Sequence, residues 1–139
     1  MALYLTFDEV GPVTVGTIHA ADMLDDNNVR DFGDQVLGHV SERPDCRLLL
    51  NFQHVLYLSS AAITELLRIR DACRPGGGML RLCGLNDSIR TVFEITNLAG
   101  LFSVHKDDTL DTALARYERA LAVAGEDDGW DDPAGGGGG

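Results

Sequence analysis

The sequence predicts an α/β fold in which a mixed sheet of about four to five strands packs against about four helices. Three observations predict it. Apolar and polar residues alternate near the N-terminus, a nearly continuous apolar run covers residues 46–52, and apolar residues recur at helical spacing in four further segments. The predicted order is β-β-α-β-α-β-α-β-α. A chain of 139 residues, 45% of them hydrophobic, is long enough to bury a core as one domain.

The first predicted strands are residues 4–7 and 13–18, which form a hairpin around the turn at residues 11–12. The first helix follows, with Asn27 or Asn28 available as its cap, and it stops near Pro44. Its apolar face consists of Val29, Phe32, Val36 and Val40.

The run at residues 46–52 predicts a central strand that is covered on both faces. A second helix begins just past Ser59 and Ser60 and ends at the Pro-Gly-Gly-Gly stretch of residues 75–78. Its predicted buried face is Ala62, Leu66, Ile69 and Cys73. Its predicted polar face is Thr64, Glu65, Arg68 and Asp71.

The remaining elements are a strand at residues 79–83, a third helix, a short strand at residues 102–104 and a last helix. Asn86 caps the third helix, and Asn97 closes it in the left-handed conformation. Asp108 or Thr109 caps the last one. The residues predicted to face the core in this part are Ile89, Val92, Phe93, Leu98, Leu101, Leu110, Ala113, Leu114, Tyr117 and Leu121.

Charge and composition divide the chain into a domain at residues 1–124 and an acidic, glycine-rich, disordered tail at residues 125–139. The formal net charge is −11; five of the 22 acids lie in the tail, which leaves 17 acids against 11 bases. An acidic body without a Lys/Arg stripe excludes nucleic acid and anionic membranes as partners. A basic partner surface fits better, although the charge can also serve solubility alone.

The chain shows neither a signal peptide nor an apolar stretch long enough to cross a bilayer, so we expect a cytoplasmic protein without membrane insertion. Cys46, Cys73 and Cys83 lack paired spacing, which predicts buried reduced thiols and no zinc site. The glycines at residues 76–78 precede no Lys-Ser/Thr pair, and no Gly-x-Ser-x-Gly motif is present. The sequence therefore predicts no enzyme, no cofactor and no metal.

Ser59 and Ser60 stand between an apolar strand and the start of an amphipathic helix. One hydroxyl is enough to cap that helix, which contributes about 1 kcal/mol. A helix N-terminus also favours negative charge, so a phosphate added there need not unfold the domain. Capping alone and phosphorylation both remain open from the residues themselves.

Residues 48–114 resemble the STAS domain, the family of bacterial anti-sigma factor antagonists, and the resemblance extends over about residues 3–122. The family shows an apolar strand, a Phe/Leu-x-Asp-Ser-Ser-Gly helix start, Gly-Gly, a strand often ending in Cys, Thr/Ser-Gly-Leu and Leu-x-x-Ala-Leu. The matching residues here are 48–52, 57–61, 76–78, 80–83, 96–98 and 110–114. Leu58 and Ala61 stand where the family usually has Asp and Gly.

The resemblance implies a phosphorylation-switched binding protein that sequesters a serine-kinase anti-sigma factor and so regulates sigma-factor-dependent transcription. It makes Ser59 the phosphorylation site, with Ser60 or Thr64 as alternatives, and a serine phosphatase a second partner. The partner-binding surface is predicted to contain Asn51, Leu58, Ser59, Ser60, Thr64, Arg68 and Asn86. The alternative is a structural STAS subunit of a lipid-transport ABC complex or stress-signalling scaffold, in which the serines only cap.

Overall fold

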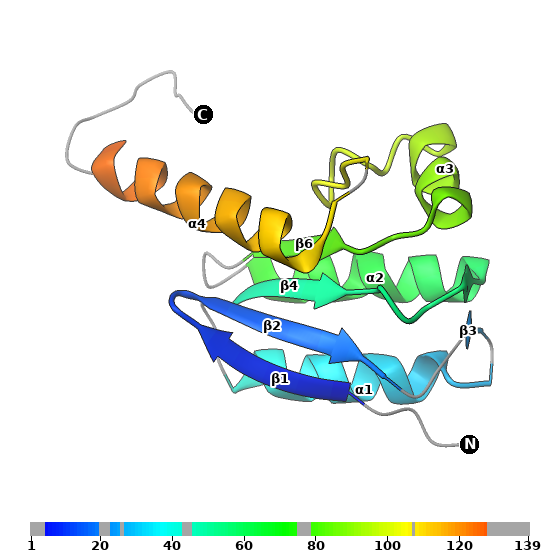
Figure 1. Ribbon diagram of the computed structural model, residues 1–139. Coiled ribbons are helices and arrows are strands. Elements are labelled where there is room, and N and C mark those ends of the chain that lie inside the picture. Colours follow the sequence, from blue (N-terminus) through cyan, green and yellow to red (C-terminus); the bar gives the residue numbers. More distant parts are fainter. Residues whose placement is uncertain are drawn as a thin grey trace.

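The computed structural model describes residues 5–19, 23–25, 27–42, 46–74, 79–106 and 108–127, the last four of them without side chains. Figure 1 shows a sheet with helices on both of its faces. The strands are β1 (Leu5–Val10), β2 (Val13–Ile18), β3 (Met23–Leu24), β4 (Arg47–Asn51), β5 (Tyr57–Leu58) and β6 (Met79–Cys83). The helices are α1 (Val29–Ser41), α2 (Ser60–Cys73), α3 (Asp87–Ile95) and α4 (Leu110–Asp127).

The main sheet has the strand order β1-β2-β4-β6 and is mixed, as predicted. β1 and β2 form an antiparallel hairpin, whereas β2 with β4 and β4 with β6 are parallel. Two parallel strands need a crossover connection, which α1 and α2 supply. The carboxyl ends of β2, β4 and β6 therefore meet at one edge of the sheet.

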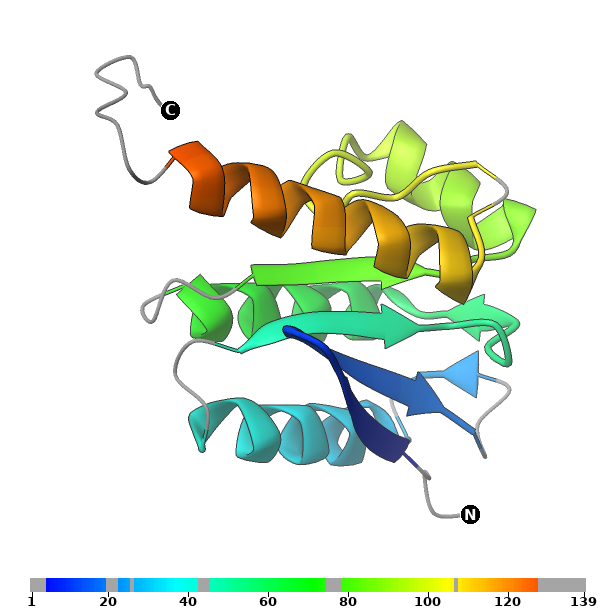
Figure 2. The same cartoon turned by 60° about the vertical axis from the view of Figure 1, so that its left-hand side comes forward.

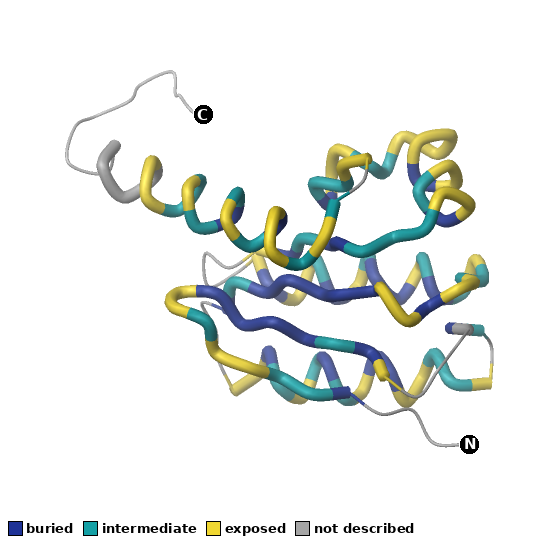
Figure 3. The backbone as a smooth tube through the Cα atoms, viewed as in Figure 1, coloured by how far each residue is buried: buried dark blue, intermediate teal, exposed yellow. Residues whose placement is uncertain are grey.

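The central strand β4 is buried on both faces, which confirms the prediction from its apolar run. Leu48 and Leu50 belong to the larger core, which α1, α2 and α3 cover. Leu49 points to the opposite face and packs with residues of α4. Figure 2 shows α1 and α4 on opposite sides of the sheet, and Figure 3 shows β2 and β4 buried between them.

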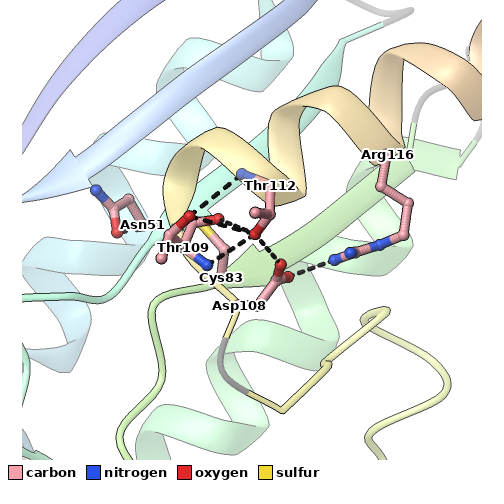
Figure 4. A network of polar contacts seen from close by, with 6 residues as sticks. All are labelled: Asn51, Cys83, Asp108, Thr109, Thr112 and Arg116. Carbon is pink, nitrogen blue, oxygen red and sulfur yellow. Dashed lines mark hydrogen bonds and ion pairs between the residues drawn. The ribbon is translucent and has the colours of Figure 1, made fainter.

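Polar contacts fix both the first turn and the middle of α4. The Thr109 hydroxyl accepts a hydrogen bond from the Thr112 amide at 3.2 Å, so Thr109 is the cap. Asp108 accepts from the Thr112 hydroxyl and pairs with Arg116 (Figure 4). Further along the helix, the buried Tyr117 donates its phenolic hydrogen to the Met79 carbonyl at 2.8 Å. A hydrogen bond thus connects α4 to β6, in addition to the apolar contacts of α4 with the sheet.

Residues 102–104 are not a strand, contrary to the prediction. Ser103 has a φ of +52°, in the left-handed region that a strand excludes. The segment still covers part of the edge of β6, because the Leu82 amide donates to the Phe102 carbonyl at 3.0 Å. Leu101 is 43% exposed rather than packed in the core.

Two further predictions about helix faces are wrong. Val92 of α3 is 42% exposed, because the helix packs against the core through the side that carries Ile89 and Phe93. Glu65 of α2 is buried instead of solvated. It lies in the contact between α1 and α2, where Gly33 has no side chain to exclude it.

The division of the chain at residue 124 remains a prediction. α4 continues through residues 125–127, which were expected in the tail, and residues 128–139 lie outside the described residues. Within the described residues, no helix is long and apolar enough to cross a membrane. The same residues contain no group of three or more His, Cys, Asp and Glu side chains placed to hold a metal.

Substitution of Gly33 tests the close approach of α1 to α2. A Cβ atom at position 33 would lie 2.1 Å from Oε2 and 2.9 Å from Cγ of Glu65. We expect Gly33→Ala to lower the free energy of unfolding by about 1–3 kcal/mol, since the contact becomes overpacked. Urea denaturation measures the loss, and the double variant with Glu65→Ala should remove it.

Gly38 provides the matched control, because it lies in the same helix and a Cβ atom there would meet nothing within 4 Å. Gly38→Ala should raise the free energy of unfolding by about 0.4–1 kcal/mol, through the lower entropy of the unfolded chain. Equal effects at both positions would contradict the packing role of Gly33.

The three cysteines are buried and form no disulfide bond with one another, as predicted. Burial raises the pKa of the Cys73 thiol to about 11 and that of Cys83 to about 12. Burial also raises the pKa of the Tyr117 phenol. Protonated thiols are poor nucleophiles, so these cysteines should be unreactive in the folded domain.

These pKa shifts predict that stability falls in alkali. A thiol whose folded pKa exceeds the ordinary value of 9.0 contributes stability that is fully present below pH 9. That contribution is lost as the pH rises from 9 toward 12. Urea denaturation between pH 7 and pH 11 should show a constant, then falling, free energy of unfolding. Cys83→Ala should make the decline shallower, and an unchanged decline would contradict the assignment.

Candidate functional site

The serine pair lies at the start of α2, at the edge of the sheet where the parallel strands end. Ser59 is the N-cap residue, with extended backbone angles of φ −82° and ψ 168°. Its Oγ accepts a hydrogen bond from the Ala62 amide at 3.2 Å, which satisfies one of the free amides of the first turn. The predicted capping role of the pair is therefore confirmed for Ser59.

A second, two-stranded parallel sheet holds the residues that lead into Ser59. β3 pairs with β5, with Met23 opposite Tyr57 and Leu24 opposite Leu58. The Ser59 amide then donates to the Leu24 carbonyl at 2.8 Å. Sequence analysis missed both strands, because each has only two residues and no alternation is visible over that length.

The predicted site residues on α2 lie at or near the surface. Ser59 is half-buried, whereas Ser60 and Thr64 are exposed. The Thr64 hydroxyl donates to the Ser60 carbonyl at 3.1 Å. The Arg68 side chain is 65% exposed and donates to Glu65 at 3.0 Å. A polar groove of about 390 Å³ runs between α1 and α2 beside these residues; it is lined by Val29, Arg30, Asp34, Ala61, Glu65 and Arg68.

Asn86 connects α3 to the segment that precedes the serines. Its Oδ1 accepts from the Ile89 amide at 2.8 Å, which caps α3 as predicted. Its Nδ2 donates to the Leu56 carbonyl at 3.1 Å. Asn86 therefore fixes the position of α3 relative to residues 56–58.

Asn51 is buried, with 2% of its surface exposed, so its predicted place in the partner-binding surface is wrong. Its Oδ1 accepts from the Gln53 amide at 3.1 Å, and its Nδ2 donates to the Gln53 side chain. A Cβ atom on Gly84 would lie 2.7 Å from that Oδ1. Asn51 thus stabilises the turn after β4 from inside.

An apolar groove of about 150 Å³ separates α3 from the start of α2, and sequence analysis did not predict it. Its lining residues are Leu56, Tyr57, Leu58, Ile63, Ser88, Ile89, Val92 and Phe93. The signal was present in the sequence as three residues, Leu56, Tyr57 and Leu58, that continue the apolar character beyond β4. Only the position of α3 makes them one wall of a groove.

α3 also carries a stripe of charged residues, on the side of the helix away from the groove-lining residues. The Arg90 guanidinium bonds to Asp87 at 3.1 Å and to Glu94 at 2.7 Å. The hydrogen bonds that Arg90 donates, first to Asp87 and then to Glu94, raise its pKa. One cation thus faces two carboxylates, which leaves an excess negative charge on α3.

The family model for the STAS domain matches residues 6–113, which is most of the chain. This chain belongs to the STAS domain family. A relative from Bordetella bronchiseptica, BtrV, carries the name of an anti-sigma factor antagonist. It is 25% identical over 117 residues, covering 84% of this chain and 97% of the relative.

Solved structures show the same STAS fold. An anti-sigma-factor antagonist domain protein from Planctomyces limnophilus matches with a TM-score of 0.71 at 20% identity, covering 84% of this chain and 98% of the other. The unphosphorylated form of the anti-sigma factor antagonist SpoIIAA matches with a TM-score of 0.67 at 16% identity, covering 83% and 96%. Its phosphorylated form matches with a TM-score of 0.61 at 17% identity, covering 81% and 98%.

Leu58 and Ala61, the two residues that differ from the STAS helix-start pattern, line different grooves. Leu58 is half-buried and lines the apolar groove. Ala61 lines the polar groove between α1 and α2. Neither residue has a positive φ, so the backbone at this turn does not require glycine.

Two substitutions of Asn86 separate its two hydrogen bonds. Asn86→Asp keeps an acceptor for the Ile89 amide but has no donor for the Leu56 carbonyl, so we expect a loss of about 1 kcal/mol. Asn86→Ala loses both bonds and should cost about 2 kcal/mol. Urea denaturation measures both losses. If the two variants lose the same free energy of unfolding, the expected separate contributions of the two hydrogen bonds are contradicted.

Proposed function

We propose that this STAS domain is an anti-sigma factor antagonist whose docking is switched by phosphorylation of Ser59. The unmodified domain binds a serine-kinase anti-sigma factor, which frees a sigma factor and so regulates transcription. A serine phosphatase restores the binding form. The domain itself carries out no catalysis and acts in the cytoplasm.

The observation that carries the proposal is the position of Ser59. Its hydroxyl caps α2 at the edge of the sheet where the parallel strands end. The pairing of β3 with β5 fixes the backbone that leads into Ser59. In phosphorylation, Oγ attacks the γ-phosphorus of ATP, ADP leaves, and the hydroxyl proton passes to a base of the kinase. The added charge of about −1.5 to −2 lies at a helix N-terminus, which tolerates it.

The effect of the phosphate on binding follows from bulk and charge. A partner that lies flat over Ser59 and the exposed Ser60 would meet both, while the fold of the STAS domain need not change. The surface around Ser59 would include Leu58, Ser60, Thr64 and Arg68, with Asn86 supporting it from α3. The existence of SpoIIAA in phosphorylated and unphosphorylated forms supports this proposal.

The test is incubation with ATP and each serine-kinase anti-sigma factor of the host, followed by mass spectrometry of the domain. We expect one phosphate at Ser59, abolished by Ser59→Ala and retained by the control variants Ser60→Ala and Thr64→Ala. Phosphate at Ser60 or Thr64 would refute the assignment to Ser59. If no kinase phosphorylates or binds the domain, the structural STAS role, in which Ser59 only caps, is the better explanation.

Two near-isosteric substitutions then separate charge from capping. Asp, Asn and Ser cap helices about equally well. The free energies of unfolding of Ser59→Asp and Ser59→Asn should therefore each lie within about 0.5 kcal/mol of the wild-type value. Ser59→Asp should weaken binding to the kinase by about tenfold or more, because it mimics part of the phosphate charge. Ser59→Asn should bind within about threefold of the wild type. Calorimetry measures both, and equal weakening by Asn would show that shape rather than charge controls docking.

A further inference from the structure

The apolar groove beside Ser59 has a size and lining that suit one ring. Its walls come from residues 56–58 and Ile63 on one side and from α3 on the other. An apolar cavity of about 150 Å³ lined by Leu, Ile and Phe is large enough to bind benzene. We propose that this groove receives one aromatic side chain from a basic surface of the anti-sigma factor. This inference rests on the proposed function, because it names the chemistry of that partner at the same surface.

Exposed apolar side chains surround the groove. Among the large hydrophobic residues of the described chain, Leu56 is 63% exposed, Tyr57 53% and Val92 42%, and all three line it. Ile95, one turn after Val92 on α3, is 74% exposed. A cluster of this kind at the rim of a pocket is characteristic of a protein–protein contact with a central aromatic anchor.

The groove keeps its shape without an occupant. Asn86 bonds to Leu56 on one wall and caps α3 on the other, and β3 holds β5 in place. A preformed pocket does not cost ordering entropy when the anchor enters, so a single ring can contribute substantially to affinity. Leu58 replaces the aspartate usual in this family, and an aspartate here would place a charge in the lining.

Charge selects the partner. The acidic balance of the chain, with 22 Asp and Glu against 11 Lys and Arg, favours a partner surface that presents lysine or arginine around the anchor. A second copy of this chain is disfavoured, because each copy carries a formal net charge of −11.

The first experiment tests the groove without the partner. Amide NMR spectra of the full chain are recorded during titration with N-acetyl-phenylalaninamide, and with N-acetyl-lysinamide as the control. We expect saturable shifts from the phenylalanine probe at the groove residues, and none there from the lysine probe. Val92→Asp should abolish the shifts. Val123→Asp is the matched control, since Val123 is 50% exposed on α4 and should leave them intact.

The second experiment uses each serine-kinase anti-sigma factor that binds the wild type. Val92→Asp and Tyr57→Ser should each weaken binding by about tenfold or more, whereas Val123→Asp should remain within about twofold. Amide spectra establish that each variant is folded. In the kinase, replacement of the contacting aromatic residue by alanine should cause the same loss and should add little in combination with Val92→Asp.

The outcomes separate this inference from the proposed function. If the phenylalanine probe causes no shifts and Val92→Asp binds like Val123→Asp, the groove inference fails, even though Ser59→Asp still blocks docking. Shifts that depend on protein concentration, with dimers in sedimentation, would identify a second copy as the occupant and overturn it. If no kinase binds the wild type, the proposed function fails and the named partner fails with it, while the probe titration still reports whether the groove takes a ring.

Discussion

The burial of β4 on both faces is the constraint on which the rest of the structure depends. Leu48 and Leu50 pack on one side and Leu49 on the other, so helices must cover both faces of the sheet. Shifting this strand by one residue would exchange the two sets of side chains, which fixes its register. Because β4 and β6 are parallel, the segments that follow them begin at the same edge. Those segments contain Ser59 and Asn86.

The candidate site is rigid because its polar groups are engaged locally. The Ser59 hydroxyl and the Asn86 amide each cap a helix, and Asn86 also bonds to Leu56. Asn51 supports the turn after β4 from inside. Residues 56–58 therefore expose apolar side chains on a backbone that hydrogen bonds hold in place. Rigid support beneath an exposed apolar surface suits a module that binds another protein.

Capping and signalling impose the same requirement on residue 59. A hydroxyl that accepts a bond from the first turn of α2 must lie where amides are unpaired and the helix dipole is positive. A phosphate is best tolerated at such a position. The switch that we propose can therefore act on the partner's approach while the core built on Leu48–Leu50 stays unchanged.

Much of the fold could be predicted from the sequence, because its signals are local. The apolar run at residues 46–52 predicted a doubly covered strand, and Ser59 and Asn86 were expected at helix starts. The prediction of a strand at residues 102–104 was wrong. Ser103 has a left-handed backbone, and the contact of this segment with β6, through the Phe102 carbonyl, comes from tertiary structure. The pairing of β3 with β5 joins residues 34 positions apart, and two-residue strands leave no periodic signal.

The sequence by itself determined the order of the four helices and of the four strands of the main sheet, the caps of α2 and α3 and the acidic character of the chain, because each depends on neighbouring residues or on composition. Only the tertiary structure decided which residues of a helix face solvent. Glu65 is buried because Gly33 of another helix leaves room for it, and Val92 is exposed because α3 packs against the core through Ile89 and Phe93. The apolar groove has the same origin, since one of its walls comes from residues 56–58 and the other from α3. Such contacts between distant segments leave no pattern in either segment alone.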